Sequence, residues 1–138
     1  MSYYLVLPFV LGVIKNENGE VLIGKHPISD TKPYPGWWDV PGGKLEKNET
    51  IEVCLVREIA EETGYDVVEK KFLGAFHHNF EKKRKENLDF IPGLAHCYEV
   101  KIEGDFKPAE MDEWRWVTKE ELEEYQLTPW AKHFLLNK

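Results

Sequence analysis

Three glutamates in the sequence are spaced so that one face of a helix would bring them together. Glu58, Glu61 and Glu62 stand at i, i+3 and i+4 within the segment REIAEETG, a spacing that stacks side chains on one helical face. Like charges placed in this way repel one another, and no lysine stands at i±4 on this face to compensate them. Most acidic helix faces are solvated surface, and the alternative is a site for a cation.

Two neighbouring features favour the cation site. The glycine-containing segment VPGGKLE leads into the acidic segment, and glycine is used where the backbone comes close to a ligand or a metal. Carboxylate oxygens are hard ligands that suit Mg²⁺ or Mn²⁺, whereas zinc prefers Cys or His side chains, which this face lacks. Arg57, beside the acids, carries a permanently charged fork that can hold a carboxylate in position.

A helix over residues 49–63 is expected to present these acids. Its apolar residues recur at helical spacing, and its other face carries the glutamates. Asn48 has a side chain suited to an N-cap, and Gly64 stands where a glycine commonly ends a helix.

The residue pattern of the rest of the chain predicts strands, followed by short helices near the C-terminus. Runs of β-branched and aromatic residues predict strands at residues 4–14, 21–24, 38–40, 72–80, 88–101 and 113–117. Asn18-Gly19 predicts a hairpin turn between the first two strands, and Thr118 and Thr128 each have the pattern that opens a short helix. This order indicates an α/β (α+β) fold in which helices pack on the faces of a mixed β-sheet. Without an internal repeat or linker, residues 1–138 are expected to form one domain.

Charge, the N-terminal segment and the cysteine content indicate which partners and which compartment to expect. The 138-residue chain has a formal net charge of −7, which argues against a nucleic acid polymer or a membrane as its partner. Its apolar N-terminal run is too short to span a bilayer and lacks the flanks of a signal peptide. Cys54 and Cys97 are the only cysteines and have no CxxC spacing, so we expect a reducing compartment, the cytoplasm.

The segment from Gly43 to Tyr65, GKLEKNETIEVCLVREIAEETGY, resembles the Nudix box, G-x5-E-x7-R-E-U-x-E-E-x-G-U, where U is aliphatic. The matching positions are Gly43, Glu49, Arg57, Glu58, Ile59, Glu61, Glu62 and Gly64. Tyr65 is the only departure, at a position that is usually aliphatic. The flanking segments GWWDVPGG and EWRWVTKEEL are also similar to those of family members. The chain is therefore identified as a member of the Nudix (MutT-like) hydrolase family, and the resemblance implies the Nudix fold.

The resemblance also implies a reaction, which is the Mg²⁺-dependent hydrolysis of a nucleoside diphosphate linked to another group. Carried over by position, it assigns metal ligation to Glu58, Glu61, Glu62 and the Gly43 carbonyl, orientation to Arg57, and a supporting role to Glu49. The box does not fix the general base. The segment GDFKPAEMDEW offers Glu110 and Glu113, of which Glu110 is preferred. Lys44 is expected to contact phosphate and Trp38 to stack on a base, although its neighbour Trp37 could serve instead.

The substrate is less well defined than the reaction. The small chain and its C-terminal segment resemble MutT-like (d)NTP pyrophosphohydrolases, which release a nucleoside monophosphate and pyrophosphate. One alternative is hydrolysis of ADP-ribose, a nucleotide-sugar or a dinucleoside polyphosphate, although the proline that ADP-ribose hydrolases carry after the box is absent around Phe80. A second alternative is a nucleotide-sensing module without catalysis, which the complete set of box carboxylates disfavours. The resemblance leaves open whether the chain forms a homodimer.

Overall fold

The structure is a computed structural model that describes residues 5–29, 33–84, 87–109, 111 and 113–136. In chain order, its elements are β1 (Leu7–Ile14), β2 (Val21–Lys25), β3 (Trp38–Asp39), β4 (Gly42–Lys44), α1 (Ile51–Thr63), β5 (Asp66–Arg84), β6 (Asn87–Glu103), β7 (Glu113–Val117), the 3-10 helix η1 (Glu121–Glu124) and α2 (Pro129–Leu136). Within the described ranges, none of the helices has the length and apolar character needed to cross a membrane.

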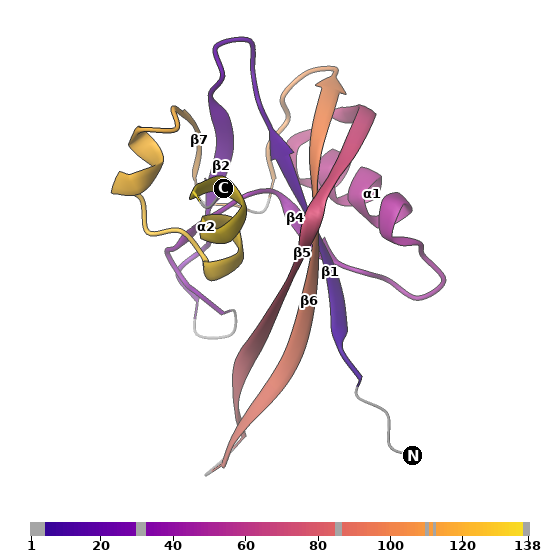
Figure 1. Cartoon of the computed structure of the whole chain (residues 1–138), viewed down its shortest axis with the longest axis vertical. Coiled ribbons are helices and arrows are strands. Elements are labelled where there is room, and N and C mark those ends of the chain that lie inside the picture. Colours follow the sequence, from indigo (N-terminus) through magenta and orange to yellow (C-terminus); the bar gives the residue numbers. More distant parts are fainter. Residues whose placement is uncertain (1–4, 30–32, 85–86, 110, 112, 137–138) are drawn as a thin grey trace.

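The described strands form two sheets, and this confirms the mixed α+β class. The larger sheet has the order β4-β1-β6-β5 and the smaller sheet has the order β3-β2-β7. Within the larger sheet, β1 runs parallel to β6 and antiparallel to β4. In Figure 1, α1 and α2 lie on opposite sides of this sheet. The sequence predicted one mixed sheet between helices, so the division into two sheets is a refinement of that prediction.

Alternation along β1 builds the core on both sides of the larger sheet. Val10 and Ile14 pack in the cluster that contains Leu55 and Ile59 of α1, whereas Leu11 faces the cluster that contains Trp130 of α2. Successive side chains of a strand point to opposite faces, so both faces of β1 are buried. Helix α1 is therefore fixed against the sheet along its apolar side, and two acids of its other side meet β4.

The expected hairpin forms its turn but not its pairing. Gly19 has φ 77° and donates to the Asn16 carbonyl at 3.0 Å, as expected for a turn at this position. The strands on either side meet only in the bridge between Lys15 and Val21. Both edges of β1 are already occupied by β4 and β6, so β2 pairs with β3 and β7 in the other sheet.

Helix α1 begins two residues later than predicted. Its N-cap is Thr50, whose side chain accepts from the Val53 N–H at 3.2 Å. The N-cap prediction for Asn48 is wrong, because Asn48 has φ 67° and lies in the turn before the helix. The predicted end of the helix is confirmed, since Gly64 adopts φ 81° and donates to the Ala60 carbonyl at 2.9 Å.

Strands β5 and β6 are longer than predicted, and β4 was not predicted. Strands β5 and β6 form a long antiparallel ribbon that extends beyond the body of the molecule (Figure 1). Thr118 and Glu121 make the expected reciprocal capping bonds at 2.9 and 3.2 Å, although the helix that follows is the 3-10 helix η1. Thr128 caps α2 through the Ala131 N–H at 3.4 Å.

Candidate functional site

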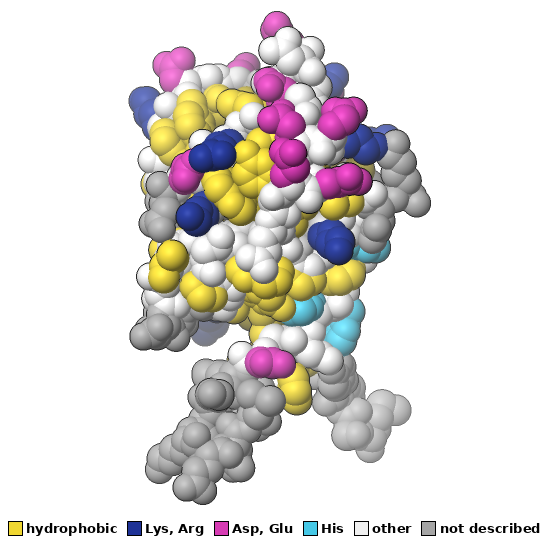
Figure 2. Space-filling model, turned by 90° about the vertical axis from the view of Figure 1, so that its left-hand side faces the viewer, with side chains coloured by type: hydrophobic (Ala, Val, Ile, Leu, Met, Phe, Trp, Pro, Cys, Tyr) yellow, Lys and Arg dark blue, Asp and Glu magenta, His cyan; other side chains and the backbone are white. Residues whose placement is uncertain are grey.

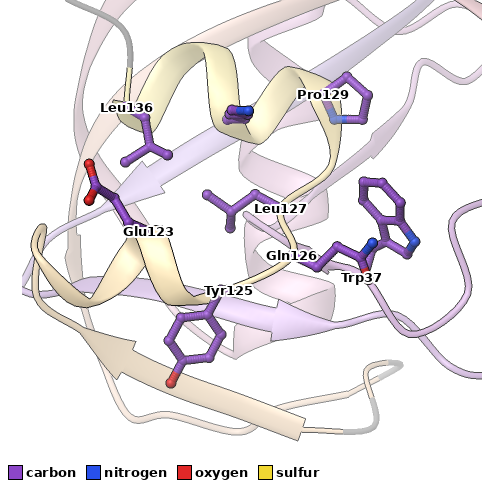
Figure 3. A pocket seen from close by; sticks show the side chains of 8 residues that line it. Trp37, Glu123, Tyr125, Gln126, Leu127, Pro129 and Leu136 are labelled. Atoms are coloured by element: carbon purple, nitrogen blue, oxygen red, sulfur yellow. The ribbon is translucent and has the colours of Figure 1, made fainter.

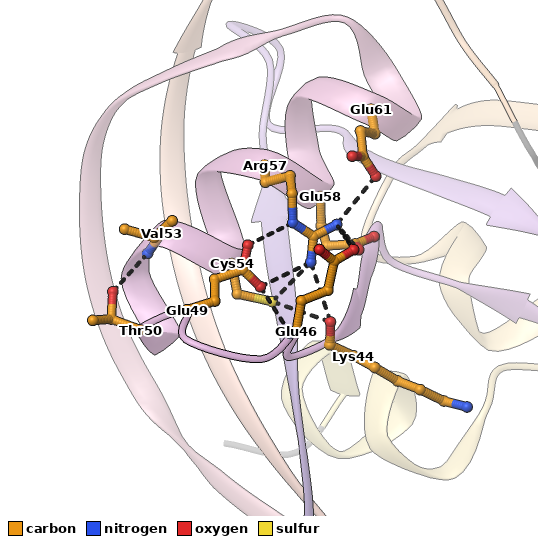
Figure 4. Close-up of polar contacts among 9 residues, drawn as sticks. All are labelled: Lys44, Glu46, Glu49, Thr50, Val53, Cys54, Arg57, Glu58 and Glu61. Atoms are coloured by element: carbon orange, nitrogen blue, oxygen red, sulfur yellow. Dashed lines mark hydrogen bonds and ion pairs between the residues drawn. The ribbon is translucent and has the colours of Figure 1, made fainter.

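Arg57 is the centre of the polar contacts around the predicted site (Figure 4). Its Nε and Nη2 donate to the two carboxylate oxygens of Glu49 at 2.5 and 2.9 Å. Its Nη1 donates to Glu58 at 2.6 Å and to Glu61 at 3.2 Å. The planar fork of arginine suits the two-point contact with Glu49, and the remaining nitrogen joins two of the predicted ligands.

This network sets the ionisation of Glu49 and Arg57. The hydrogen bond from Arg57 lowers the pKa of Glu49 to about 2, and the backbone N–H of Glu46 contributes in the same direction. The hydrogen bond to Glu49 in turn raises the pKa of Arg57. Both groups therefore stay charged at neutral pH. Arg57 also donates to the Lys44 carbonyl at 3.2 Å, which ties α1 to β4.

The two glycines of β4 let the acids of α1 approach the backbone. The Gly42 N–H donates to Glu62 Oε1 at 2.7 Å, and Glu62 is only 4% exposed. A Cβ on Gly43 would lie 2.3 Å from the carboxyl carbon of Glu58, a distance that no side chain tolerates. Glycine is therefore required for Glu58 to lie against the strand. The structure brings Glu58 and Glu62 to neighbouring residues of the same short strand.

The chemistry of these donors fits a hard divalent cation. Glu58, Glu61 and Glu62 offer carboxylate oxygens of the kind that Mg²⁺ and Mn²⁺ prefer. Within the described ranges, no three His, Cys, Asp or Glu side chains are grouped closely enough to hold an ion as they stand. Arg57 Nη1 contacts Glu58 Oε1 and Glu61 Oε2 together, so these two oxygens reach an ion only if their carboxylates turn from Arg57. Glu61 has the longer contact and a 53% exposed side chain.

Glu110 and Glu113 are the two candidates for the general base. Glu110 lies outside the described residues. Its neighbour Ala109 donates to the Glu62 carbonyl at 2.9 Å, so the chain before Glu110 is tied to the end of α1. Glu113 accepts from Arg115 and is therefore engaged on the surface of β7.

Trp38 belongs to the core, and its stacking on a base stays a prediction. It is 9% exposed and packs edge-on against Tyr125 at 5.0 Å. Its neighbour Trp37 lines an open cavity of about 650 Å³ together with Tyr125, Gln126 and Lys132 (Figure 3). Figure 2 shows the side of the molecule to the left in Figure 1, where hydrophobic side chains are exposed beside acidic ones.

Lys44 takes part in the site through its backbone. Its carbonyl accepts from Arg57, whereas its side chain extends away from the acids in Figure 4. The predicted contact of its ammonium with phosphate stays a prediction.

Asp39 is a buried carboxylate that the sequence analysis did not single out. Its oxygens accept from Trp130 Nε1 at 2.9 and 3.0 Å and from the Val40 N–H at 2.7 Å, and one lies 3.0 Å from His26 Nε2. Burial lowers the pKa of His26, but the hydrogen bond and charge of Asp39 outweigh burial and raise it. A buried acid within an apolar segment needs hydrogen-bond partners of this kind. The position of Asp39 within the apolar segment WWDV is therefore the sequence signal that could have revealed this cluster.

Comparisons with known proteins place these features in a family. A family model described as NUDIX domain matches residues 7–137. The low-salt glycan biosynthesis protein Agl8 of Haloferax volcanii is 39% identical over 93 residues, which are 67% of this chain and 57% of that protein. An 8-oxo-dGTP diphosphatase of Proteus vulgaris is 40% identical over 74 residues, 54% of this chain and 64% of that protein. The match thus spans less than two thirds of either curated relative.

Solved structures share the fold over nearly the full chain. The MutT protein from Methanosarcina mazei Go1 has a TM-score of 0.76 at 27% identity, covering 94% of this chain and 90% of that one. A MutT NUDIX hydrolase from Burkholderia pseudomallei has a TM-score of 0.78 at 22% identity, covering 96% and 97% of the two chains. At that identity the second likeness concerns the fold alone.

Proposed function

The chain belongs to the NUDIX domain family, and on that premise we propose that it hydrolyses a phosphoric anhydride bond in a nucleoside diphosphate linked to another group. The observation that carries the proposal is the approach of Glu58 and Glu62 to the two glycines of β4. Among substrates of this class, a (d)NTP cleaved to a nucleoside monophosphate and pyrophosphate has the best support. The 8-oxo-dGTP diphosphatase of Proteus vulgaris and the MutT protein of Methanosarcina mazei are similar to this chain.

The proposed cofactor is Mg²⁺, for which Mn²⁺ can substitute, held by Glu58, Glu61 and Glu62. When bound, Mg²⁺ supplies charge neutralisation of phosphate oxygens and acidifies a coordinated water. Glu62 is the proposed indispensable ligand, because its carboxylate is buried and fixed by the Gly42 N–H. Arg57 holds Glu58 from the side and is itself held by Glu49.

A backbone carbonyl of β4 completes the proposed ligand set. The Pro41 carbonyl accepts from the Gly12 N–H of β1 at 2.8 Å, and backbone groups two residues apart in a strand point to the same side. The carbonyl of Gly43 is then directed at β1. Gly42, whose N–H donates to Glu62, faces α1. We therefore prefer the Gly42 carbonyl to the Gly43 carbonyl as this ligand.

We propose that a glutamate carboxylate removes the proton of the attacking water, and that Glu110 is this base. The support is that Ala109, the preceding residue, is hydrogen-bonded to the backbone of Glu62. A base must be within hydrogen-bond reach of the proton it removes, and the bond from Ala109 keeps the residue before Glu110 at the C-terminal end of α1, where Glu61 and Glu62 lie.

The proposal is tested by turnover on a panel of substrates. NTPs, dNTPs including 8-oxo-dGTP, ADP-ribose and dinucleoside polyphosphates are incubated with Mg²⁺ and then with EDTA. We expect metal-dependent release of a nucleoside monophosphate from at least one of them. Absence of turnover on every substrate, with binding of nucleotide retained, would instead identify a nucleotide-sensing module.

Glu62→Gln separates ligation from folding. The glutamine oxygen can still accept from the Gly42 N–H, so the fold is expected to persist while the negative charge is lost. We expect kcat to fall by at least about 100-fold, the scale seen when a metal ligand or an electrostatic partner is removed. Glu17→Gln, in an exposed turn, is the matched control and should leave kcat unchanged. Full activity of Glu62→Gln would remove Glu62 from the site.

A further inference from the structure

Strand β5 is the edge of the larger sheet and carries exposed apolar side chains. In the described part of the chain, β6 is its only strand partner, so its outer edge is unpaired. Val68, Phe72 and Leu73 are 49%, 53% and 41% exposed. An edge strand with apolar side chains is a template for pairing with another chain unless it is protected. Register shifts at Val68 and Leu73 limit the regular part of β5 here to the four residues between them.

The sequence of this edge is complementary to itself. Residues 67–73 read VVEKKFL, with an acid and a base on either side of Lys70 and apolar residues beyond them. When two copies align antiparallel about Lys70, Glu69 of each copy lies opposite Lys71 of the other, within the regular part of the strand. The two-fold symmetry makes this pair twice. Opposite charges that face each other across two strands stabilise a sheet.

Lys70 would stand on the symmetry axis, opposite Lys70 of the second copy. An acid of the same chain reduces the repulsion between these two like charges. Lys70 Nζ lies 3.7 Å from Glu52 Oε2 on α1, so its charge is partly neutralised within its own chain. Val56 is one helical turn beyond Glu52 on the same face of α1, and it is 41% exposed. An apolar residue of α1 therefore lies on the side of the helix that faces β5 and extends the apolar surface.

We propose that this edge, formed by residues 67–73 of β5 with Glu52 and Val56 of α1, is the interface of a homodimer. Two copies pair antiparallel about Lys70, and their larger sheets join into one continuous sheet. A C2 arrangement uses the same patch on both copies, as the self-complementary order of charges requires. The glycines that meet Glu58 and Glu62 lie on β4, at the opposite edge of this sheet, so the dimer leaves them uncovered.

Charge reversal tests the pairing. The molar mass of the full chain is measured by sedimentation equilibrium across a concentration series, together with Glu69→Lys, Lys71→Glu and the double variant. Each single change places like charges opposite one another twice per dimer, so the dissociation constant should rise roughly tenfold or more. The double variant restores opposite charges and should dimerise again. Glu69 also pairs with Lys101 at 3.2 Å, but both side chains are exposed, so its loss should hardly change folding stability.

A cysteine at the axis tests the register. Lys70→Cys places a thiol opposite its own copy and should give a disulfide-linked dimer under mild oxidation, whereas Lys101→Cys, on the inner strand β6, should not. The native Cys54 and Cys97 are buried and do not interfere. A wild-type chain that stays monomeric overturns the proposal. A dissociation constant that the single charge reversals leave unchanged also overturns it. Equal disulfide cross-linking of Lys70→Cys and Lys101→Cys does so as well.

Discussion

Gly43→Ala is the substitution that most directly tests the approach of Glu58 to β4. The new Cβ would lie 2.3 Å from the Glu58 carboxyl carbon and from Oε2, and 2.7 Å from Oε1. Carbon atoms in contact are separated by about 3.5–4.0 Å, so the carboxylate must retreat by more than about 1 Å. Arg57 Nη1 holds that carboxylate at 2.6 Å, so we expect the retreat to disturb this contact. A misplacement of about 1 Å can cost about 100-fold in rate.

The assay is steady-state turnover of the best substrate of the panel, with thermal unfolding measured in parallel. We expect kcat of Gly43→Ala to fall about 100-fold with little loss of folding stability, because the atoms met are the end of the flexible Glu58 side chain, which can turn away. Gly19→Ala is the matched control. Its φ of 77° makes alanine strained, but no atom lies within 4 Å of the new Cβ, so it should cost about 1–2 kcal/mol without lowering kcat. If folded Gly43→Ala keeps kcat within a few-fold of wild type, Glu58 does not act from this position.

Three further predictions follow from the site and the buried groups. Arg57→Lys keeps a charge but loses the two-point contact with Glu49, so kcat should fall by roughly 10–100-fold in the same assay. Burial raises the pKa of Cys54 to about 12, so a thiol reagent at mild alkaline pH should label it only after unfolding. The folded pKa of His26 is raised above 6.5, so its pair with Asp39 stabilises fully below the unfolded pKa and is lost as pH rises through the folded pKa. His26→Asn should therefore lower the melting temperature more at acidic pH than at alkaline pH.

The fold was predictable where local patterns decide it. Strand β7 has the predicted bounds, and Gly64 ends α1 as expected, because alternation and capping act over a few residues. Strand β4 could not be predicted in this way, since glycine is depleted in strands. Glycine permits the close pairing of β4 with β1, because a Cβ on Gly42 would lie 2.0 Å from the Val10 carbonyl oxygen.

Parts of the site depend on contacts between distant segments, which one sequence does not specify. The period of a strand places Trp37 and Trp38 on opposite faces but does not say which face is buried. The C-terminal segment decides this, because Leu127 forms a parallel bridge with Trp38 and Tyr125 packs on its ring. Helical spacing predicted the acidic face of α1 correctly, yet the glycine contacts that hold two of those acids come from β4.

Arg57 explains how three acids can share one face of α1 and still be free to bind the proposed cation. Its Nη1 offsets the charge of both Glu58 and Glu61, which reduces the repulsion that their spacing implies. The Glu61 contact is exposed, and exposed ion pairs contribute only about 0.2–1 kcal/mol. Turning Glu61 from Arg57 toward an ion is therefore a small cost, whereas the two-point contact between Arg57 and Glu49 keeps the guanidinium in place. The arrangement stabilises the acids in the folded chain and leaves one of them free to move.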